Sequence, residues 1–178
     1  KMYTDYKALL ADSDVEWVMI SVPNHLHHDI AIDAAKAKKN IIVEKPCALN
    51  VQEFDEMYQA AKDNGVLFTV DQNRRWDRDY CTVKKVLEQN SIGKVFMVKS
   101  SHYGVFGRMH DWHEYPECGG GMLYDWGVHL IDQMLDLIPG KITQISADMK
   151  CAVNKSVDDY FRILLYFDNG LAAEIELG

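Results

Sequence analysis

The 178-residue chain has no apolar run of the roughly 20 residues that a helix needs to cross a bilayer. It also has no excess of positive charge, because 19 Lys and Arg stand against 27 Asp and Glu, a formal net charge of -8. Nucleic acids and anionic membranes select cationic surfaces. We therefore expect neither a nucleic acid nor a membrane among the partners. The hydrophobic content of 48% is ordinary for a globular protein and argues against disorder.

Cysteine is scarce, and the spacing of the few cysteines is informative. More than thirty residues separate each of the four from the next: Cys47, Cys81, Cys118 and Cys151. There is no Cys-x-x-Cys pair of the kind found in structural zinc sites and redox motifs. Isolated thiols are typical of a reducing compartment. We expect a cytoplasmic protein without a metal site.

Three apolar runs of strand length alternate with helical patterns in the first part of the chain. The runs cover residues 16–22, 41–43 and 66–70. Between the last two, Asn50-Val51-Gln52-Glu53 resembles a capping box, and Asn64-Gly65 closes the helix that it opens. This strand–helix–strand–helix–strand order predicts right-handed crossovers and a parallel sheet.

The pattern changes after residue 75. A long strand is expected from Lys94 to Phe106, and a glycine-led helix over about 121–137. Alternating segments follow, and Asn169-Gly170 between the last two is a hairpin signal. Such segments predict an antiparallel sheet with one face covered. The expected fold class is α/β, with a parallel-sheet domain over residues 1–75 and an α+β domain with a largely antiparallel sheet over residues 76–178.

Two short segments about eighty residues apart carry the side chains best suited to chemistry. Glu44-Lys45-Pro46 ends an apolar run, at the carboxyl edge of the expected parallel sheet, where α/β folds place their ligands. Asp125 and His129 are four residues apart, one helical turn, so both side chains can point the same way. A lysine, an aspartate and a histidine meeting in one cleft form an acid/base set.

Each segment also has a simpler interpretation. Lys45 alone would fit a surface lysine in a proline turn. Asp125, His129, Asp132 and Asp136 form a polar stripe that would fit the solvated face of an amphipathic helix. A helix that follows three glycines and is rich in Trp, Met and Leu is not expected to leave a whole face in water. We expect the stripe to line a cleft between this helix and the first domain.

Both segments resemble the Gfo/Idh/MocA family, the glucose–fructose oxidoreductase and inositol dehydrogenase group of NAD(P)-dependent enzymes. Two further strings are similar to the family's motifs: Pro23-Asn24 with a histidine three residues on, and Asn73-Arg74-Arg75-Trp76. The four occur in the family's order along nearly the whole chain. The resemblance implies the last part of a Rossmann dinucleotide-binding domain, followed by a substrate and oligomerisation domain.

The resemblance also implies a reaction, the oxidation or reduction of a secondary alcohol of a sugar or cyclitol by hydride transfer. The implied catalytic residues are Lys45, Asp125 and His129. An imidazole titrates near neutral pH, so His129 is the expected base, with Lys45 hydrogen-bonded to the reacting oxygen. Asp125 would orient the substrate or support the imidazolium. Whether His129 or Lys45 moves the proton stays open.

The implied cofactor is NAD or NADP, with NAD favoured on family frequency. The residues that the resemblance places against it are Pro23, Asn24, His25, Glu44, Lys45 and Asn73. The family often uses its second sheet as a homo-oligomer interface, so a homo-oligomer is expected. One departure concerns the turn before Glu44, where the family usually has Ala-Gly-Lys and this chain has Ala37-Lys38-Lys39-Asn40. Because asparagine tolerates left-handed geometry, we expect Asn40 to preserve the turn.

No Gly-x-Gly-x-x-Gly turn precedes Val18. Such a turn lets the backbone approach a dinucleotide pyrophosphate at a helix N-terminus. We therefore expect the chain to be the central portion of a longer enzyme and inactive by itself.

Two other functions fit the same resemblance. One is a noncatalytic relative that binds a nucleotide or sugar as a sensor or scaffold, although intact Lys45, Asp125 and His129 argue against it. The other is an enzyme that recycles tightly held NAD in a net nonoxidative sugar reaction, such as hydrolysis or elimination. Sugar-dependent appearance of NADH distinguishes the main hypothesis from both.

Overall fold

The computed structural model describes residues 1–104 and 109–178. They form two compact units, the first made of Lys1–Asp71 with Glu117–Gly119 and the second of Gln72–Pro116 with Gly120–Gly178. Each unit has its own hydrophobic core. The domain division that the sequence suggests after residue 75 falls near the unit boundary and stays a prediction for the complete protein.

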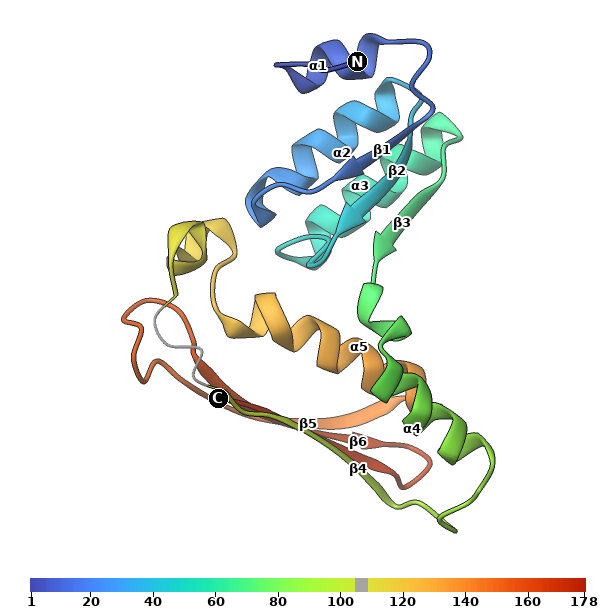
Figure 1. Ribbon diagram of the computed structural model, residues 1–178, viewed down its shortest axis with the longest axis vertical. Helices are drawn as coiled ribbons and strands as arrows, with labels where there is room; N and C mark the ends of the chain where they lie inside the picture. Colours follow the sequence, from blue (N-terminus) through green and yellow to red (C-terminus); the bar gives the residue numbers. More distant parts are fainter. Residues whose placement is uncertain (105–108) are drawn as a thin grey trace. The chain divides into compact units, whose positions relative to one another are not determined.

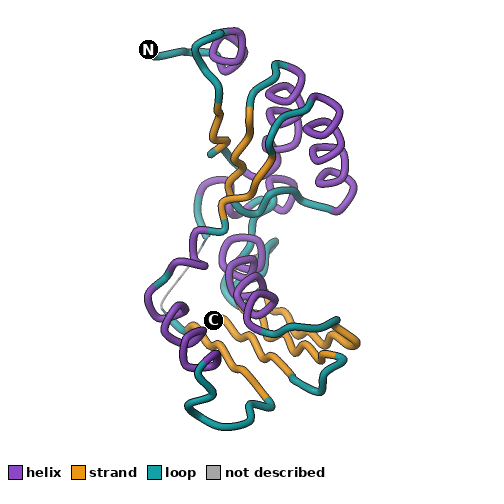
Figure 2. The backbone as a smooth tube through the Cα atoms, turned by 90° about the vertical axis from the view of Figure 1, so that its right-hand side faces the viewer, coloured by secondary structure: helices purple, strands orange, loops and turns teal. Residues whose placement is uncertain are grey.

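The first unit is built on a parallel sheet, as predicted. Strands β1 (Trp17–Ile20), β2 (Asn40–Glu44) and β3 (Phe68–Asp71) pair side by side in that order. Helices α2 (His27–Lys36) and α3 (Val51–Asn64) are the crossovers, and the short α1 (Tyr6–Ala11) precedes them. Figure 2 shows α2 and α3 on the same side of the strands. Ala34, Ile41 and Val43 are fully buried between these layers.

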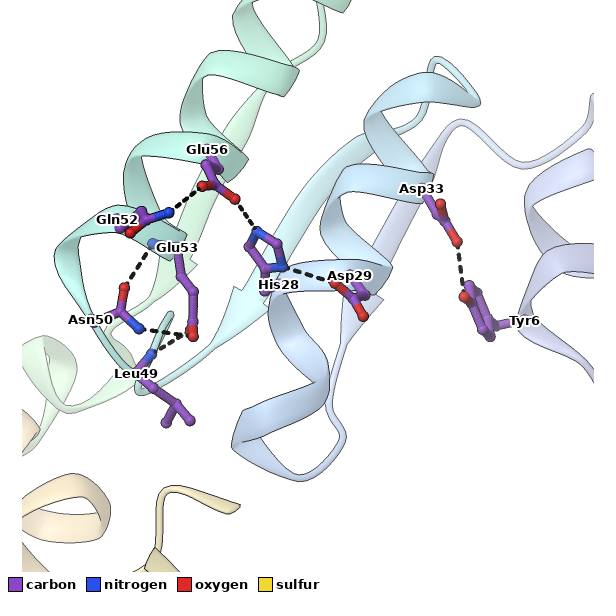
Figure 3. Close-up of polar contacts among 9 residues, drawn as sticks. All are labelled: Tyr6, His28, Asp29, Asp33, Leu49, Asn50, Gln52, Glu53 and Glu56. Atoms are coloured by element: carbon purple, nitrogen blue, oxygen red, sulfur yellow. Dashed lines mark hydrogen bonds and ion pairs between the residues drawn. The ribbon is translucent and has the colours of Figure 1, made fainter. Parts of the chain in front are cut away.

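The start of α3 confirms Asn50 as the cap and Glu53 as reaching back, although the backbone N–H that Glu53 accepts is that of Leu49, one residue before the cap. The Asn50 side chain accepts the Glu53 N–H at 2.9 Å, and the Glu53 carboxylate reaches back to accept the Leu49 N–H at 2.9 Å (Figure 3). These bonds satisfy backbone donors that a helix start leaves without partners. At the other end, Gly65 has a φ of 68° in the left-handed region that helix C-caps favour.

The second unit is built on a mixed four-stranded sheet. Its strands are β4 (Met97–His102), β5 (Ile142–Lys150), β6 (Tyr160–Phe167) and β7 (Ala172–Leu177), in the order β4-β7-β6-β5. The pairs β5–β6 and β6–β7 are antiparallel, as expected, whereas β4 and β7 are parallel. The expected strand over residues 94–106 is shorter, and its residues 105 and 106 lie outside the described residues.

Helix α5 (Val128–Leu137) covers one face of this sheet (Figure 1). Alternate residues of β6 point towards it, and Phe161, Ile163, Leu165 and Phe167 are all buried. Along the chain, helix α4 (Arg78–Glu88) follows the short 3-10 helix η2 (Asn73–Trp76) and precedes β4. The remaining short helices are η1 (Asn24–Leu26), η3 (Asp111–Glu114) and η4 (Pro116–Cys118).

The glycine-led helix does not begin as an α-helix. Its first turn, η5 (Leu123–Gly127), is a π-helix that runs directly into α5. The N–H of Val128 bonds the carbonyl of Leu123, five residues back, which defines this wider turn. Single π turns inside helices occur frequently at functional sites. The expected helix is therefore present, with a different geometry around Asp125.

The turn before β2 corrects one expectation. The left-handed residue is Lys38, with a φ of 60°, whereas Asn40 is the first residue of β2. The N–H of Lys38 bonds the Ala35 carbonyl and the N–H of Lys39 bonds the Ala34 carbonyl, which is a Schellman motif. Lys38 thus stands at the position of this motif where glycine is usual.

Replacing Lys38 by glycine is expected to stabilise the protein by about 1 kcal/mol, because left-handed geometry strains a residue that has a Cβ. The matched control is Lys38→Ala, which removes the same amine and its 3.1 Å bond to the Asn64 carbonyl but keeps the strain. Thermal unfolding of both variants measures the difference. A glycine variant no more stable than the alanine variant would contradict this account.

Candidate functional site

The first unit brings one group of candidate residues to one edge of its sheet. β1 leads into Pro23, Asn24 and His25, and β2 ends at Glu44 and leads into Lys45. Because β1 and β2 are parallel neighbours, their carboxyl ends lie at the same edge. Glu44 and Lys45 are half-buried, and the peptide bond between Lys45 and Pro46 is cis. A carboxylate and an amine therefore stand together at the edge where α/β folds bind ligands.

Asn24 has a role inside the first unit that its sequence context does not reveal. Its side chain is buried, and its Nδ2 donates to the Gly119 carbonyl at 2.9 Å. This bond ties the start of η1, after β1, to the first glycine of the Gly119-Gly120-Gly121 run. His25, by contrast, is exposed.

His27 is the histidine three residues after Asn24 in the Pro-Asn string, and it was not among the expected site residues, although its ring joins two turns at this edge. The side chain is fully buried, with Nδ1 2.9 Å from the Pro46 carbonyl oxygen and Nε2 2.9 Å from the Val22 carbonyl oxygen. The ring thus joins the turn after β1 to the turn after β2. The signal was present in the sequence, because His27 precedes Ala31 and Ala34 at the spacing of a buried helical face.

The second unit contains the other candidates. Asn73 is exposed in η2, Asp125 is half-buried in the π turn, and His129 is buried in the first turn of α5. The His129 ring lies edge-on to Trp126 at 6.1 Å between centroids. Trp126 also stacks on His102 at 4.6 Å, and the Arg74 guanidinium lies 4.2 Å from its ring centroid. His129 is therefore held in a packed cluster of aromatic and cationic groups.

The later part of the polar stripe is structural. The Asp132 carboxylate accepts two bonds from the Arg75 guanidinium, both at 2.7 Å. Asp136 accepts from the Tyr80 hydroxyl and from Lys84, the latter at 2.7 Å. The partners of this part of the stripe come from η2 and α4 of the same unit.

The contacts between Asp136, Tyr80 and Lys84 shift the pKa values of Asp136 and Tyr80 in opposite directions. The Lys84 ammonium and the Tyr80 hydroxyl bond to it and lower the pKa of Asp136. Burial is the main cause that raises the pKa of Tyr80, and the hydrogen bond to Asp136 is the next largest. This pair of bonds anchors α4 to the last turn of α5.

No group of three or more His, Cys, Asp or Glu side chains in residues 1–104 and 109–178 is arranged to hold a metal ion. Within the same residues, no helix is both long and apolar enough to cross a membrane. All four cysteines are free thiols.

Comparison with known families matches both halves of the chain. Residues 1–72 match the oxidoreductase family with an NAD-binding Rossmann fold, GFO_IDH_MocA. Residues 80–178 match the GFO/IDH/MocA C-terminal domain.

Individual relatives agree with this assignment. An uncharacterized oxidoreductase of Schizosaccharomyces pombe is 35% identical over 93% of this chain and 46% of its own length. The scyllo-inositol 2-dehydrogenase (NADP(+)) of Bacillus subtilis is 32% identical over 86% of this chain and 43% of its own length. The crystal structure of an NAD-binding protein from Listeria innocua superimposes with a TM-score of 0.97 at 40% identity, over 100% of this chain and 51% of that one. The chain thus spans about half the length of the relatives it matches.

Removal of the His27 ring is expected to destabilise the first unit. His27→Ala takes away the bonds to two backbone carbonyls and leaves a cavity, so we expect a loss of about 2 to 4 kcal/mol in the free energy of unfolding. His25→Ala is the control, since that side chain is exposed on the same short segment. Denaturant titration of both variants checks this, and equal stabilities would contradict the bridging role of His27.

Cys47, directly after Pro46, is expected to be the least reactive thiol. Burial raises the pKa of Cys47 to about 12, so little thiolate is present at pH 8. Cys81 and Cys151 are exposed and serve as internal controls. Timed alkylation with iodoacetamide followed by peptide mass spectrometry should show Cys47 labelled last, and labelling of Cys47 at the rate of Cys81 would refute the prediction.

Proposed function

The chain belongs to the GFO/IDH/MocA family of oxidoreductases, and from this premise we propose that the complete protein interconverts a secondary alcohol and a ketone on a cyclitol or sugar, with NAD or NADP as the hydride carrier. The observation that carries the proposal is the buried imidazole of His129, fixed against Trp126 one turn from Asp125. The similarity to a scyllo-inositol dehydrogenase supports the substrate class.

The first unit has the chemistry that a dinucleotide needs. The parallel strands β1 and β2 end side by side, β1 leads into the segment that carries Asn24, and β2 ends at Glu44. The half-buried carboxylate of Glu44 and amine of Lys45 follow each other at that edge. A carboxylate there suits ribose hydroxyls, which donate hydrogen bonds. We propose that Pro23, Asn24, His25, Glu44, Lys45 and Asn73 contact the cofactor. When bound, the nicotinamide supplies the hydride acceptor or donor.

Side chains of the protein then transfer the proton of the substrate hydroxyl. In the oxidation direction, the substrate hydroxyl must lose its proton as the carbon loses hydride. We propose that His129 accepts this proton and that Lys45 donates a hydrogen bond to the same oxygen as negative charge develops on it. Asp125 supports the resulting imidazolium or orients the substrate by accepting from a neighbouring hydroxyl. In the reduction direction the same groups act in reverse.

The position of these groups suits such a role. His129 sits on a helix, and Lys45 leaves the end of a core strand, so each side chain starts from a rigid element. We propose a cytoplasmic location on the basis of the free thiols, and the homo-oligomer expected from the resemblance stays a prediction.

Replacing His129 by asparagine is expected to lower kcat/KM by about 100- to 10,000-fold, the usual contribution of a positioned acid/base group. The assay uses the complete protein with a panel of cyclitols and sugars and both NAD and NADP, followed at 340 nm. His28→Asn is the matched control, because His28 bonds Asp29 and Glu56 on α2 and α3 and has no part in the proposed chemistry (Figure 3).

Cofactor affinity of His129→Asn, measured by fluorescence titration with NADH and NADPH, should stay within a few-fold of wild type. Unchanged turnover in this variant would remove His129 from the mechanism. Binding of sugars by the wild-type protein without turnover on any member of the panel would favour the noncatalytic alternative.

A further inference from the structure

The start of the helix that carries Asp125 and His129 is held by a residue far along the chain. The N–H of Leu123 donates to the Asp158 carboxylate at 2.7 Å, and the N–H of Met122 donates to the Asp158 backbone carbonyl at 2.9 Å. The first amides of a helix have no acceptor within the helix. Asp158, in the segment between β5 and β6, supplies acceptors for two of them.

The absence of a side chain at Gly121 leaves room for the Asp158 carboxylate. Its φ is 99°, and a Cβ added to it would lie 2.3 Å from the Asp158 Oδ1. Real Cβ atoms do not approach an oxygen so closely, so the carboxylate occupies the space that any side chain at residue 121 would need. The glycine and the aspartate therefore form a complementary pair, with the carboxylate seated over the helix start.

The turn that presents Asp158 is itself well fixed. The neighbouring Asp159 carboxylate accepts the N–H groups of Ala152, Val153 and Asn154 at 2.6 to 2.7 Å. Val157 is buried in the core of the second unit. Asp158 thus reaches the helix from a rigid base, which a positioning group requires.

The contact fixes the backbone from which Asp125 and His129 project. Leu123 is the first residue of the π turn, and its carbonyl accepts the Val128 N–H. Asp125 lies two residues beyond Leu123 and donates its own N–H to the Gly121 carbonyl at 3.1 Å. We propose that Asp158 is a positioning residue, whose carboxylate seated on Gly121 and bonded to Leu123 sets the placement of Asp125 and His129 for the reaction proposed above. This role rests on that proposed function.

The charge of Asp158 is not favoured by its surroundings. Burial raises the pKa of its carboxyl, and the negative charge of Asp159 acts in the same direction. The folded-state pKa therefore lies above the unfolded value, so ionisation of Asp158 weakens stability as the pH rises through the folded pKa. An uncharged acceptor of the same shape would avoid this cost, which makes Asp158→Asn the variant that keeps the geometry without the charge.

The chain offers a matched control at the other end of α5. Asp168 accepts the Lys141 N–H at 3.0 Å, and a Cβ added to Gly140 would lie 2.5 Å from the Asp168 Oδ1. This is the same glycine–aspartate arrangement, but it follows α5 and touches neither the π turn nor His129. Loss of Asp168 removes an equivalent carboxylate and backbone bond without loosening the start of the helix.

The test compares Asp158→Ala, Asp158→Asn and Asp168→Ala in the complete protein by hydrogen–deuterium exchange and steady-state kinetics. An open pocket of about 310 Å³ borders Asp158. Because water can enter it and solvate the freed amide, we expect Asp158→Ala to fold. Loss of a bond to a charged group should speed exchange of the amides of residues 122–125 by about ten- to a hundredfold.

In kinetics, Asp158→Ala should lower kcat by about tenfold or more at an unchanged KM for NAD or NADP, because small displacements of reacting groups are costly. Asp158→Asn should restore both readouts. Asp168→Ala should leave exchange at 122–125 and kcat at wild-type values, whatever its effect on thermal stability.

Three results would overturn the inference: unchanged exchange at residues 122–125 in Asp158→Ala, equal losses of kcat in Asp158→Ala and Asp168→Ala, or an Asp158→Asn variant as impaired as Asp158→Ala. Failure of the proposed function has a different signature, since wild-type protein would then show no turnover on any substrate. The exchange experiment still tests in that case whether Asp158 holds the helix start.

Discussion

Backbone polar groups at the ends of strands and helices need partners once they are buried, and this requirement shapes the surroundings of the sheet edge that carries Glu44 and Lys45 and of the helix that carries Asp125 and His129. The carbonyls of Val22 and Pro46, beyond β1 and β2, share the ring of His27. The amides at the start of the π turn are satisfied by Asp158. Pro46 is 19 residues from His27, and Leu123 is 35 residues from Asp158, so satisfying these backbone groups also locks two elements together. The residues proposed for chemistry project from positions that are fixed in this way.

The polar stripe of the long helix shows how one pattern serves two purposes. Asp132 and Asp136 bond Arg75, Tyr80 and Lys84, and these contacts attach α5 to η2 and α4. His129 instead packs against Trp126, whose other neighbours are Arg74 and His102. The charged end of the stripe therefore anchors the helix, and its first turns hold the acid/base candidates. An amphipathic helix with a solvated face would need none of these partners.

Sequence reasoning succeeded where structure is set by neighbouring residues. The capping box at Asn50 and Glu53 and the parallel order of the first sheet depend on local patterns, and both were predicted. The parallel pairing of β4 with β7, the π turn around Asp125 and the bridge through His27 depend on contacts between distant segments. The left-handed residue was assigned to Asn40 by its propensity, but the hydrogen bonds that end α2 place that geometry on Lys38. The hydrogen bonds that end α2 therefore outweigh the intrinsic preference of asparagine for left-handed geometry.

Support for α5 comes from several separate elements of the second unit. Asp158 holds the start of the helix. In the middle of the helix, the Gln133 side chain donates to the Arg74 carbonyl at 2.9 Å, and Asp136 attaches the last turn to α4. Because these contacts act at different points along the axis, the helix can neither slide nor rotate without breaking several of them at once. Asp125 and His129 lie between the first two of these points. Their relative placement is therefore determined within the second unit, which is the condition that proton transfer in a short, fixed geometry requires.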